Sequence, residues 1–334
     1  MNIQFSKSLR RAAFYGLHAL VRMVPSAFWR RRRLALVEEF QAQPPNARAA
    51  IEKRVDYYNR LSRPFALSPT AERVSAFSSK NKSSAYSCDF RRVTAGLPAE
   101  ARVSYLFGDV TEIPETPHFV KSRPVTEGPA NANSVLLKLN SIRHYCFVED
   151  QIPFAAKKPM AVWRGKSNRQ HRIDFARRFA DHPMCNIGCV RHKEKSAQPW
   201  HRNYMSIQEQ LQYQFIVSVE GIDVATNLKW IMASNSLCLM RKPRYETWFM
   251  EGSLIAGYHY VQLKDDHSDL PAKIEYYRNH PDEAQAIIKN ANAFSQQFMD
   301  RRQETLIAWL VIDRYLQLSG QPSKTRRYAL AEPA

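Results

Sequence analysis

The stretch from Tyr213 to Met240 constrains the fold most strongly, because it has the pattern of two strands joined by a helix. Residues 214–219 are apolar and rich in β-branched side chains, which favours a short buried strand. Residues 228–232 carry apolar side chains at helical spacing, and residues 236–240 return to a strand pattern. This order predicts a βαβ unit with parallel strands and therefore an α/β fold.

The turn inside this unit is the first candidate binding site. Gly221 allows the chain to turn sharply after the first strand, and Asp223 or Thr226 can cap the helix that follows. In a parallel sheet, ligands bind at the carboxyl ends of the strands, where the start of a helix offers backbone N–H groups to a phosphate. An ordinary crossover of an α/β core explains the same pattern without a ligand.

The size and charge of the chain narrow the possible partners. The chain has 334 residues, which is enough for two domains of ordinary size. A formal net charge of +18 predicts anionic partners: nucleic acid, an acidic membrane surface or phosphorylated substrates. Five dispersed cysteines fit reduced thiols in a cytoplasmic compartment. Cys185 and Cys189 lack a second pair that would complete a zinc site, so we expect no metal.

Residues 1–45 are predicted to form an N-terminal basic amphipathic segment. Residues 12–29 are largely apolar, but charged residues and a proline interrupt them, so we expect neither a membrane span nor a signal peptide. Four consecutive arginines follow at 30–33. A helix lying on an anionic membrane leaflet explains this order, and a helix docked on the protein's own surface explains it equally well.

Residues 46–155 are predicted to form a first α/β domain. A helical apolar pattern begins at Asn46 and ends before Pro64, and residues 104–107 read as a strand. Residues 135–139 and 144–148 each fit either a strand or a buried helix.

Residues 156–300 are predicted to form a second domain, which begins with an apolar strand at 160–163. The strand runs into a basic glycine turn and then into a helix. A turn of this kind, rich in hydrogen-bond donors, suits a diphosphate, and arginine can hold phosphate oxygens with two hydrogen bonds. A solvated basic surface is the alternative. The residues of interest in the turn are Arg164, Gly165, Arg169 and Arg172.

Three blocks of the sequence resemble glycosyltransferase family 90. They are AVWRGKSNRQHR at 161–172, YQFIVSVEGIDVATNLKWIMASNSLCLM at 213–240 and YETWFMEGSLIAGYHYVQLKDDHSDL at 245–270. The family includes capsule-associated CAP10 proteins, eukaryotic protein O-glucosyltransferases and bacterial lipopolysaccharide-modifying transferases. KSRP at 121–124 and LLKLNSIRHY at 136–145 are similar to the bacterial lipopolysaccharide branch.

The resemblance, which covers roughly residues 117–300, implies a GT-B-like architecture of two Rossmann-like domains facing across a cleft. It implies that the second domain holds a nucleotide-sugar donor, usually without a metal ion, and no cofactor is expected. Side chains and helix N-termini must then neutralise the diphosphate leaving group. Arg164 and Arg172 match the family's motif arginines, and Lys229 matches a family lysine. Asn227 stands where the glucosyltransferases have an arginine, which leaves the donor sugar open.

The predicted donor-binding residues all lie in the second domain. Glu251 belongs to a region that shapes the nucleotide-sugar pocket in the family, so it is a candidate partner for hydroxyl groups of the sugar or the ribose. The full set is Arg164, Gly165, Arg169, Arg172, Gly221, Asp223, Asn227, Lys229 and Glu251. Residues 301–334 are expected to form a helix that crosses back to the first domain, followed by a tail.

An inverting transferase also needs a base that takes the proton from the acceptor hydroxyl. In the family's glucosyltransferases this base is an aspartate of the first domain, but the matching region near 129–136 offers only asparagines. We expect Asp150 to serve, because it follows an apolar run close before the donor-binding strand, with Glu127 as the second choice. The other carboxylates considered are Asp109 and Glu149.

The sequence therefore predicts a glycosyltransferase. Its expected donor is a nucleotide sugar, in the family a UDP-linked hexose, and its expected acceptor is a lipopolysaccharide core or another surface glycan. It would work in the cytoplasm, bound peripherally to the inner face of the bacterial inner membrane. The alternative is a nucleic-acid-binding protein with a basic surface. Such a protein should carry a basic stripe with stacking aromatic residues on one sheet. Here the arginines gather at the N-terminus and at one strand-to-helix turn, and the sequence has no RNP or zinc-finger pattern, so we do not expect nucleic acid as a partner.

Overall fold

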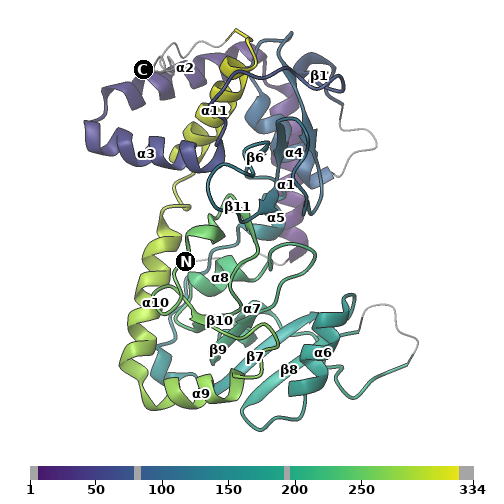
Figure 1. The fold of residues 1–334 in the computed structure, drawn as a ribbon, viewed down its shortest axis with the longest axis vertical. Coiled ribbons are helices and arrows are strands. Elements are labelled where there is room, and N and C mark those ends of the chain that lie inside the picture. Colours follow the sequence, from purple (N-terminus) through teal and green to yellow (C-terminus); the bar gives the residue numbers. More distant parts are fainter. Residues whose placement is uncertain (1–6, 79–83, 192–195, 323–334) are drawn as a thin grey trace. The chain divides into compact units, whose positions relative to one another are not determined.

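The computed structural model describes residues 7–78, 84–191 and 196–322 (Figure 1). The chain forms two compact units built from separate stretches of sequence. Unit 1 comprises residues 1–143, 245–250 and 300–334, and unit 2 comprises residues 144–244 and 251–299. The division falls after Arg143, whereas the sequence suggested residue 155. Residues 144–155 belong to unit 2, and within this stretch Phe154 packs on the sheet of unit 2 against Phe215.

The helices of unit 1 enclose an apolar core. Ile51, Val55 and Tyr58 of α3 are at most 2% exposed, as their helical spacing predicted, and α11 packs against α2, α3 and α4. The α-helices are α1 Lys7–Met23, α2 Ser26–Ala42, α3 Pro45–Tyr58, α4 Ser84–Thr94, α5 Ser141–His144, whose last residue already belongs to unit 2, and α11 Arg301–Leu318, with a 3-10 helix η1 at Val74–Ala76.

Among the described residues of unit 1, the strands are short and form three small sheets. β3, β4 and β6 make a parallel sheet, β11 pairs antiparallel with β5, and β1 pairs antiparallel with β2. The strand expected at 104–107 is present as β3, whereas residues 145–148 form neither a strand nor a helix. The strands are β1 Glu72–Arg73, β2 Arg102–Val103, β3 Tyr105–Leu106, β4 His118–Val120, β5 Ser122–Pro124, β6 Ser134–Leu136 and β11 Tyr245–Thr247.

Unit 2 is built on one parallel sheet of five strands in the order β12-β10-β9-β7-β8. β9 and β10 lie side by side with Ile216 opposite Cys238, so the predicted βαβ unit is confirmed. The parallel sheet and its helices make an α/β fold, as predicted. The strands are β7 Lys158–Lys166, β8 Cys185–Val190, β9 Tyr213–Ser218, β10 Leu237–Met240 and β12 Val261–Gln262.

Helices pack on this sheet and bury its apolar side chains. Trp163, Phe215 and Leu239 of the strands share a core with residues of α6, α9 and α10. The α-helices are α6 Gln170–Phe179, α7 Ile207–Gln210, α8 Leu228–Met232, α9 Leu270–Asn279 and α10 Pro281–Gln296, and the 3-10 helices are η2 Phe154–Ala156 and η3 Glu251–Ser253.

Two local predictions for unit 2 were wrong. Neither Asp223 nor Thr226 caps α8: its N-cap is Asn227, whose side chain makes no capping hydrogen bond, because the segment before the helix forms bends and turns. Gly165 does not lie in a turn. It is part of β7, where it pairs with Cys189 of β8.

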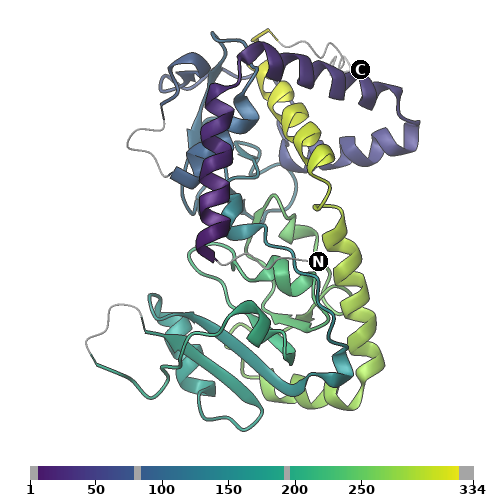
Figure 2. The same cartoon turned by 180° about the vertical axis from the view of Figure 1, so that it is seen from behind.

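The N-terminal region forms two helices that belong to unit 1 (Figure 2). One face of α1 packs against α4, where His18 is 5% exposed and its Nε2 lies 3.6 Å from an oxygen of Asp89. Docking on the protein's own surface, one of the two interpretations left open by the sequence, therefore holds for this face. No helix in the described stretches of the chain is long and apolar enough to cross a membrane.

Candidate functional site

The strand order of unit 2 reverses between β7 and β9. β7 comes first in the sequence, β8 is added on one side of it, and β9, β10 and β12 follow on the other side. In open parallel sheets, ligands bind beyond the carboxyl ends of the strands at such a reversal. The candidate donor site is therefore the edge of the sheet where β7 and β9 end, together with the first turn of α6.

Arg172 and His171 connect the first turn of α6 to the end of β9. The Arg172 guanidinium donates from Nε to the Glu220 carbonyl at 2.9 Å and from Nη2 to the Val219 carbonyl at 3.1 Å. His171 Nε2 lies 2.9 Å from the same Glu220 carbonyl oxygen. A Cβ on Gly221 would come within 3.3 Å of Arg172 Nη2, so the glycine leaves room for the guanidinium. The structure thus brings Arg172 and Gly221 together.

Two further arginines, which the sequence analysis did not select, lie at the same edge. Arg241 and Arg244 follow β10, and both form ion pairs with the Glu220 carboxylate, at 3.1 and 2.8 Å. Their position in the sequence could have identified them as candidates, because RKPR at 241–244 comes directly after the second strand of the predicted βαβ unit. With Arg172, they place three guanidinium groups around the residues that end β9.

Arg164 makes its hydrogen bonds elsewhere in unit 2. Its Nη1 donates to the Asn186 carbonyl and its Nη2 to Asn186 Oδ1, both at 2.7 Å, and its Nε donates to the Asn203 carbonyl at 2.9 Å. Asn186 belongs to β8, the strand on the side of β7 away from β9. Burial lowers the pKa of Arg164, although the guanidinium remains charged at neutral pH. These contacts tie Arg164 to β8 and to the loop at residue 203.

Gly165 serves the packing of a neighbouring tryptophan. A Cβ at this position would overlap the six-membered ring of Trp163, which is itself 2% exposed and packs edge-on against Phe175 of α6. The glycine is therefore required by the indole ring that lies over the strand.

Three other predicted donor residues are distributed around the two helix starts. Arg169 is exposed at the N-cap of α6. Asn227 ties β9 to α8, because its Nδ2 donates to the Val217 carbonyl at 3.0 Å and its Oδ1 lies 3.1 Å from Ser218 Oγ. Asp223 is buried, with 2% of its surface exposed.

Lys229 and Glu251 are brought together, but as partners of each other. The Lys229 ammonium forms an ion pair with the Glu251 carboxylate, and the two side chains are 0% and 1% exposed. Each charge thus neutralises the other inside unit 2, since a buried charge requires a partner.

Asp150, the first choice for the base, is enclosed by hydrogen-bond donors of unit 2. Its Oδ2 accepts from Lys157 Nζ at 2.7 Å and from the Asn235 backbone N–H at 2.9 Å, and its Oδ1 accepts from the Ile152 N–H at 3.1 Å. Its side chain is 2% exposed. These contacts fasten the segment before β7 to the sheet, and a carboxylate so engaged is poorly placed to receive a substrate proton.

Glu149 is exposed in unit 2, directly before Asp150. The two remaining carboxylates lie in unit 1. Glu127 is exposed in the segment between β5 and β6. Asp109 follows β3 and Lys121 follows β4, so both lie at the carboxyl edge of the parallel β3-β4-β6 sheet. Asp109 Oδ1 accepts from Lys121 Nζ at 2.6 Å and from the Tyr86 hydroxyl at 3.2 Å.

The charge state of Asp109 follows from these neighbours. Burial alone would raise the pKa of this carboxyl, but the charge and hydrogen bond of Lys121 outweigh burial and hold the pKa below its ordinary value. Asp109 is therefore ionised at neutral pH, and its side chain is 26% exposed. Of the four carboxylates considered, Asp109 alone combines partial exposure with a position at the carboxyl edge of a parallel sheet.

Comparison with known proteins identifies the kind of enzyme that carries this arrangement. Residues 134–329 match the model of Glycosyl transferase family 90. The chain is 51% identical over 305 residues to the O-glucosyltransferase LpsA of Dichelobacter nodosus, a match that covers 91% of this chain and 95% of that protein. It is 23% identical over 175 residues to protein O-glucosyltransferase 3 of Homo sapiens, covering 51% of this chain and 34% of that protein. The chain is thus a glycosyltransferase and belongs to glycosyltransferase family 90.

Proposed function

We propose that this enzyme transfers glucose from a UDP-linked donor to a lipopolysaccharide core or a similar surface glycan. The donor sugar is supported by the name of the relative from Dichelobacter nodosus, an O-glucosyltransferase that matches almost end to end. The acceptor is supported by the likeness of KSRP at 121–124 and LLKLNSIRHY at 136–145 to the lipopolysaccharide-modifying branch of the family. A GT-B-like architecture, with units 1 and 2 as its two domains, is part of the same proposal.

The observation that carries the donor site is the group of arginines at the carboxyl edge of the unit 2 sheet. Arg172, Arg241 and Arg244 surround the end of β9, and Glu220 orients two of them. A diphosphate is well suited to such a group, because guanidinium groups can bind phosphate oxygens with two hydrogen bonds. Positive groups held in place before the reaction also stabilise the charge that develops on a leaving diphosphate, so we propose no metal or other cofactor.

Asp109 is the proposed base. In the transfer step, the acceptor oxygen attacks the anomeric carbon while the carboxylate takes the hydroxyl proton, and the bond to the diphosphate breaks with its electron pair leaving on UDP. The arginines of unit 2 neutralise that charge. We propose that the anomeric configuration is inverted, as in the protein O-glucosyltransferases that the sequence resembles. Asp109 replaces Asp150 and Glu127 in this role because Asp150 is enclosed by donors and Glu127 lies in an exposed loop.

A transfer assay with matched variants tests this assignment. Arg244→Gln should lower the transfer rate by about 100-fold, because it removes one preorganised charge from the leaving group. Arg278→Gln, a loss of the same charge from an exposed position on α9, should leave the rate unchanged. Asp109→Asn should also lower the rate by about 100-fold while keeping donor affinity, measured as thermal stabilisation by UDP-glucose.

The other carboxylates provide the comparison for the base. Asp150→Asn should lower the stability of unit 2 more than the rate per folded molecule, since its oxygens hold Lys157 and two backbone N–H groups. Glu127→Gln should act as wild type. Full transfer activity in Asp109→Asn would reject the proposed base, and full activity in Arg244→Gln would reject the proposed phosphate contact.

A further inference from the structure

Helix α1 leaves an apolar face open to solvent. Its other face is docked on unit 1 through His18, which is 5% exposed and lies against Asp89 of α4. Leu17, Leu20 and Met23 are 51%, 57% and 78% exposed, although large apolar side chains usually gain stability from burial. At about 100° per residue, Leu20 and Met23 point away from the side that carries His18. Packing within unit 1 therefore buries only one side of α1.

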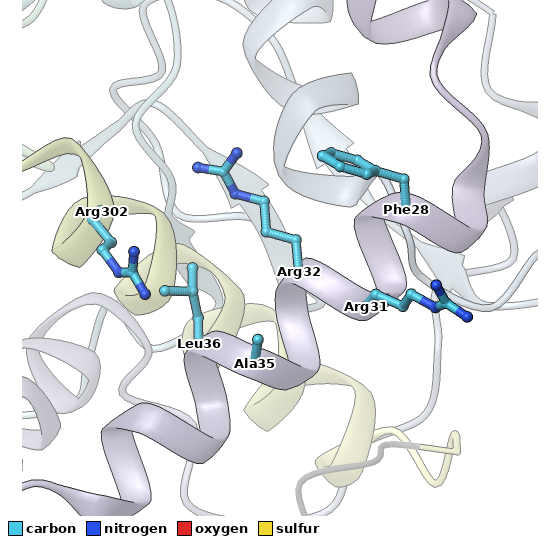
Figure 3. A pocket seen from close by; sticks show the side chains of 6 residues that line it. All are labelled: Phe28, Arg31, Arg32, Ala35, Leu36 and Arg302. Carbon is cyan, nitrogen blue, oxygen red and sulfur yellow. The ribbon is translucent and has the colours of Figure 1, made fainter.

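A basic pocket lies beside the next helix. It has a volume of about 550 Å³ and lies between α2 and the start of α11 (Figure 3). Figure 3 shows the Phe28 and Arg32 side chains extending from α2, with Arg302 of α11 nearby. Three arginines and three apolar residues line it, namely Phe28, Arg31, Arg32, Ala35, Leu36 and Arg302.

The arginines of this region differ in how far the protein neutralises them. Arg33 is largely buried and forms an ion pair with Asp313, and Arg302 pairs with Glu39. Arg31 and Arg32 are exposed, and within the described part of the chain neither forms an ion pair. Arg30 is exposed as well, and among the described residues it has no ion-pair partner either. Three positive charges of the four-arginine run therefore remain available to an external anion.

Positive charge is also concentrated behind this surface. Burial lowers the pKa of Arg92, and although Asp89 opposes this effect, the like charges of Arg301 and Arg32 lower the pKa further. Nearby arginines thus repel one another, and an anionic partner would relieve that repulsion.

We propose that α1 and α2 form a membrane-docking surface for an anionic phospholipid bilayer. Leu17, Leu20 and Met23 enter the boundary between headgroups and acyl chains, and Arg31 and Arg32 bind lipid phosphates. Exposed apolar side chains on α1 and exposed arginines on the helix that follows it combine the two residue types of helices that lie in a bilayer interface. The charge of the pocket selects an anionic surface, because lysine and arginine near such a surface each strengthen binding. This inference concerns where the enzyme works and does not depend on the identity of its donor or acceptor.

Point variants of the full chain are the appropriate test, because deletion of residues 1–33 would damage unit 1. It would remove the ion-pair partner of Asp313 and strip α1 from α4, where it covers Asp89. The exposed residues can be changed without these losses, since none of them contributes to the buried core.

The experiment is co-sedimentation with vesicles of phosphatidylethanolamine and phosphatidylglycerol. Arg31→Gln/Arg32→Gln should weaken binding about 30-fold, since each charge contributes about 1 kcal/mol near an anionic surface. Leu17→Ser/Leu20→Ser should weaken binding by at least tenfold. Arg278→Gln/Lys289→Gln, which removes the same charge from exposed sites on α9 and α10, should bind as wild type. Transfer to a soluble acceptor should be unchanged in all three variants.

Four outcomes would overturn the proposal. Wild-type binding by either test variant would show that the changed residues do not contact the bilayer. An equal loss in the control variant would show that only net charge matters. Equal binding to vesicles of pure phosphatidylcholine would remove the requirement for anionic lipid. Displacement by inorganic phosphate at constant ionic strength would indicate a site for free phosphate in place of a bilayer surface.

Discussion

At the scale of single residues, Gly165 shows how a packing requirement can resemble a binding motif. The residue belongs to the WRG sequence, and the adjacent basic residues suggested a phosphate-binding turn. In the structure it lies in β7, where the Trp163 ring occupies the space that a side chain would need. A glycine is required whether an aromatic ring or a phosphate lies against the backbone, because either one occupies the space of a Cβ. The sequence pattern therefore does not distinguish packing from phosphate binding.

Gly165→Ala should destabilise the protein by about 1 to 3 kcal/mol, because the added methyl group must displace a packed tryptophan. Gly16→Ala is the matched control. Gly16 lies inside α1, and a Cβ added there would meet no atom within 4 Å, so alanine should add about 0.5 to 1 kcal/mol through its helix propensity. Urea unfolding measures both changes. Equal stability of Gly165→Ala and wild type would contradict the packing role.

His267 is a second residue whose environment decides its behaviour. Its ring packs against Phe175 of α6 and is 5% exposed. The pKa of His267 is lowered to about 4, mainly by burial and to a smaller extent by the positive charge of Arg241. An unfolded histidine has a pKa of about 6.5, so between these two values the unfolded chain binds a proton that the folded chain does not.

Stability should therefore fall as the pH falls from about 6.5 to about 4, and this histidine should account for about 3 kcal/mol of the loss. His267→Asn should remove this part of the pH dependence of the unfolding free energy. Asparagine tolerates the positive φ of 58° at this position better than most residues. The measurement is the difference in unfolding free energy between wild type and variant at neutral pH and near pH 4. A difference that does not change with pH would contradict the prediction.

At the scale of elements, α8 is stabilised by its packing in unit 2. It has five residues, all buried, and a helix this short is unstable in isolation. Lys229 therefore enters the interior with the helix, and Glu251 of η3 supplies the opposite charge. The two residues were predicted to bind the donor, and the ion pair gives them a structural role in unit 2.

Lys229→Met should cost about 3 to 5 kcal/mol of stability, because it leaves the Glu251 carboxylate buried without its ammonium partner. The double variant Lys229→Met/Glu251→Leu should recover most of this loss, since a buried ion pair can be replaced by apolar residues of similar volume. Chemical unfolding of the three proteins measures the coupling. If the single variant is as stable as wild type, the pair does not have the structural role. A stable double variant that no longer binds UDP-glucose would support contact with the donor.

At the scale of the whole molecule, the two units are assembled from interleaved stretches of the chain. Residues 245–250 directly follow Arg244, the last residue of the proposed donor site, yet β11 pairs with β5 of unit 1. Glu246 of that strand is 1% exposed and accepts from Arg123 Nε at 2.7 Å. This pairing joins positions more than a hundred residues apart, so local sequence patterns could not reveal it.

The regular elements of unit 2 were predictable because their signals are local. The buried strands β7, β9 and β10 are runs of apolar residues, and α6 shows apolar side chains at helical spacing. Of the nine predicted donor residues, the structure brings Arg172 and Gly221 together at the end of β9 and pairs Lys229 with Glu251. Arg241 and Arg244 were missed because the sequence does not show that both lie beside the Glu220 carboxylate in the folded chain.

The sequence by itself determined the α/β class, the parallel βαβ unit, the basic character of the chain and its resemblance to family 90, because each depends on residue order or composition. Only the tertiary structure decided which charges remain available for ligands. Lys229 is neutralised by Glu251, Asp150 by Lys157 and Arg33 by Asp313, whereas Arg31 and Arg32 stay exposed. Ion pairing depends on distances of a few ångströms between groups that can be far apart along the chain, and folding sets those distances.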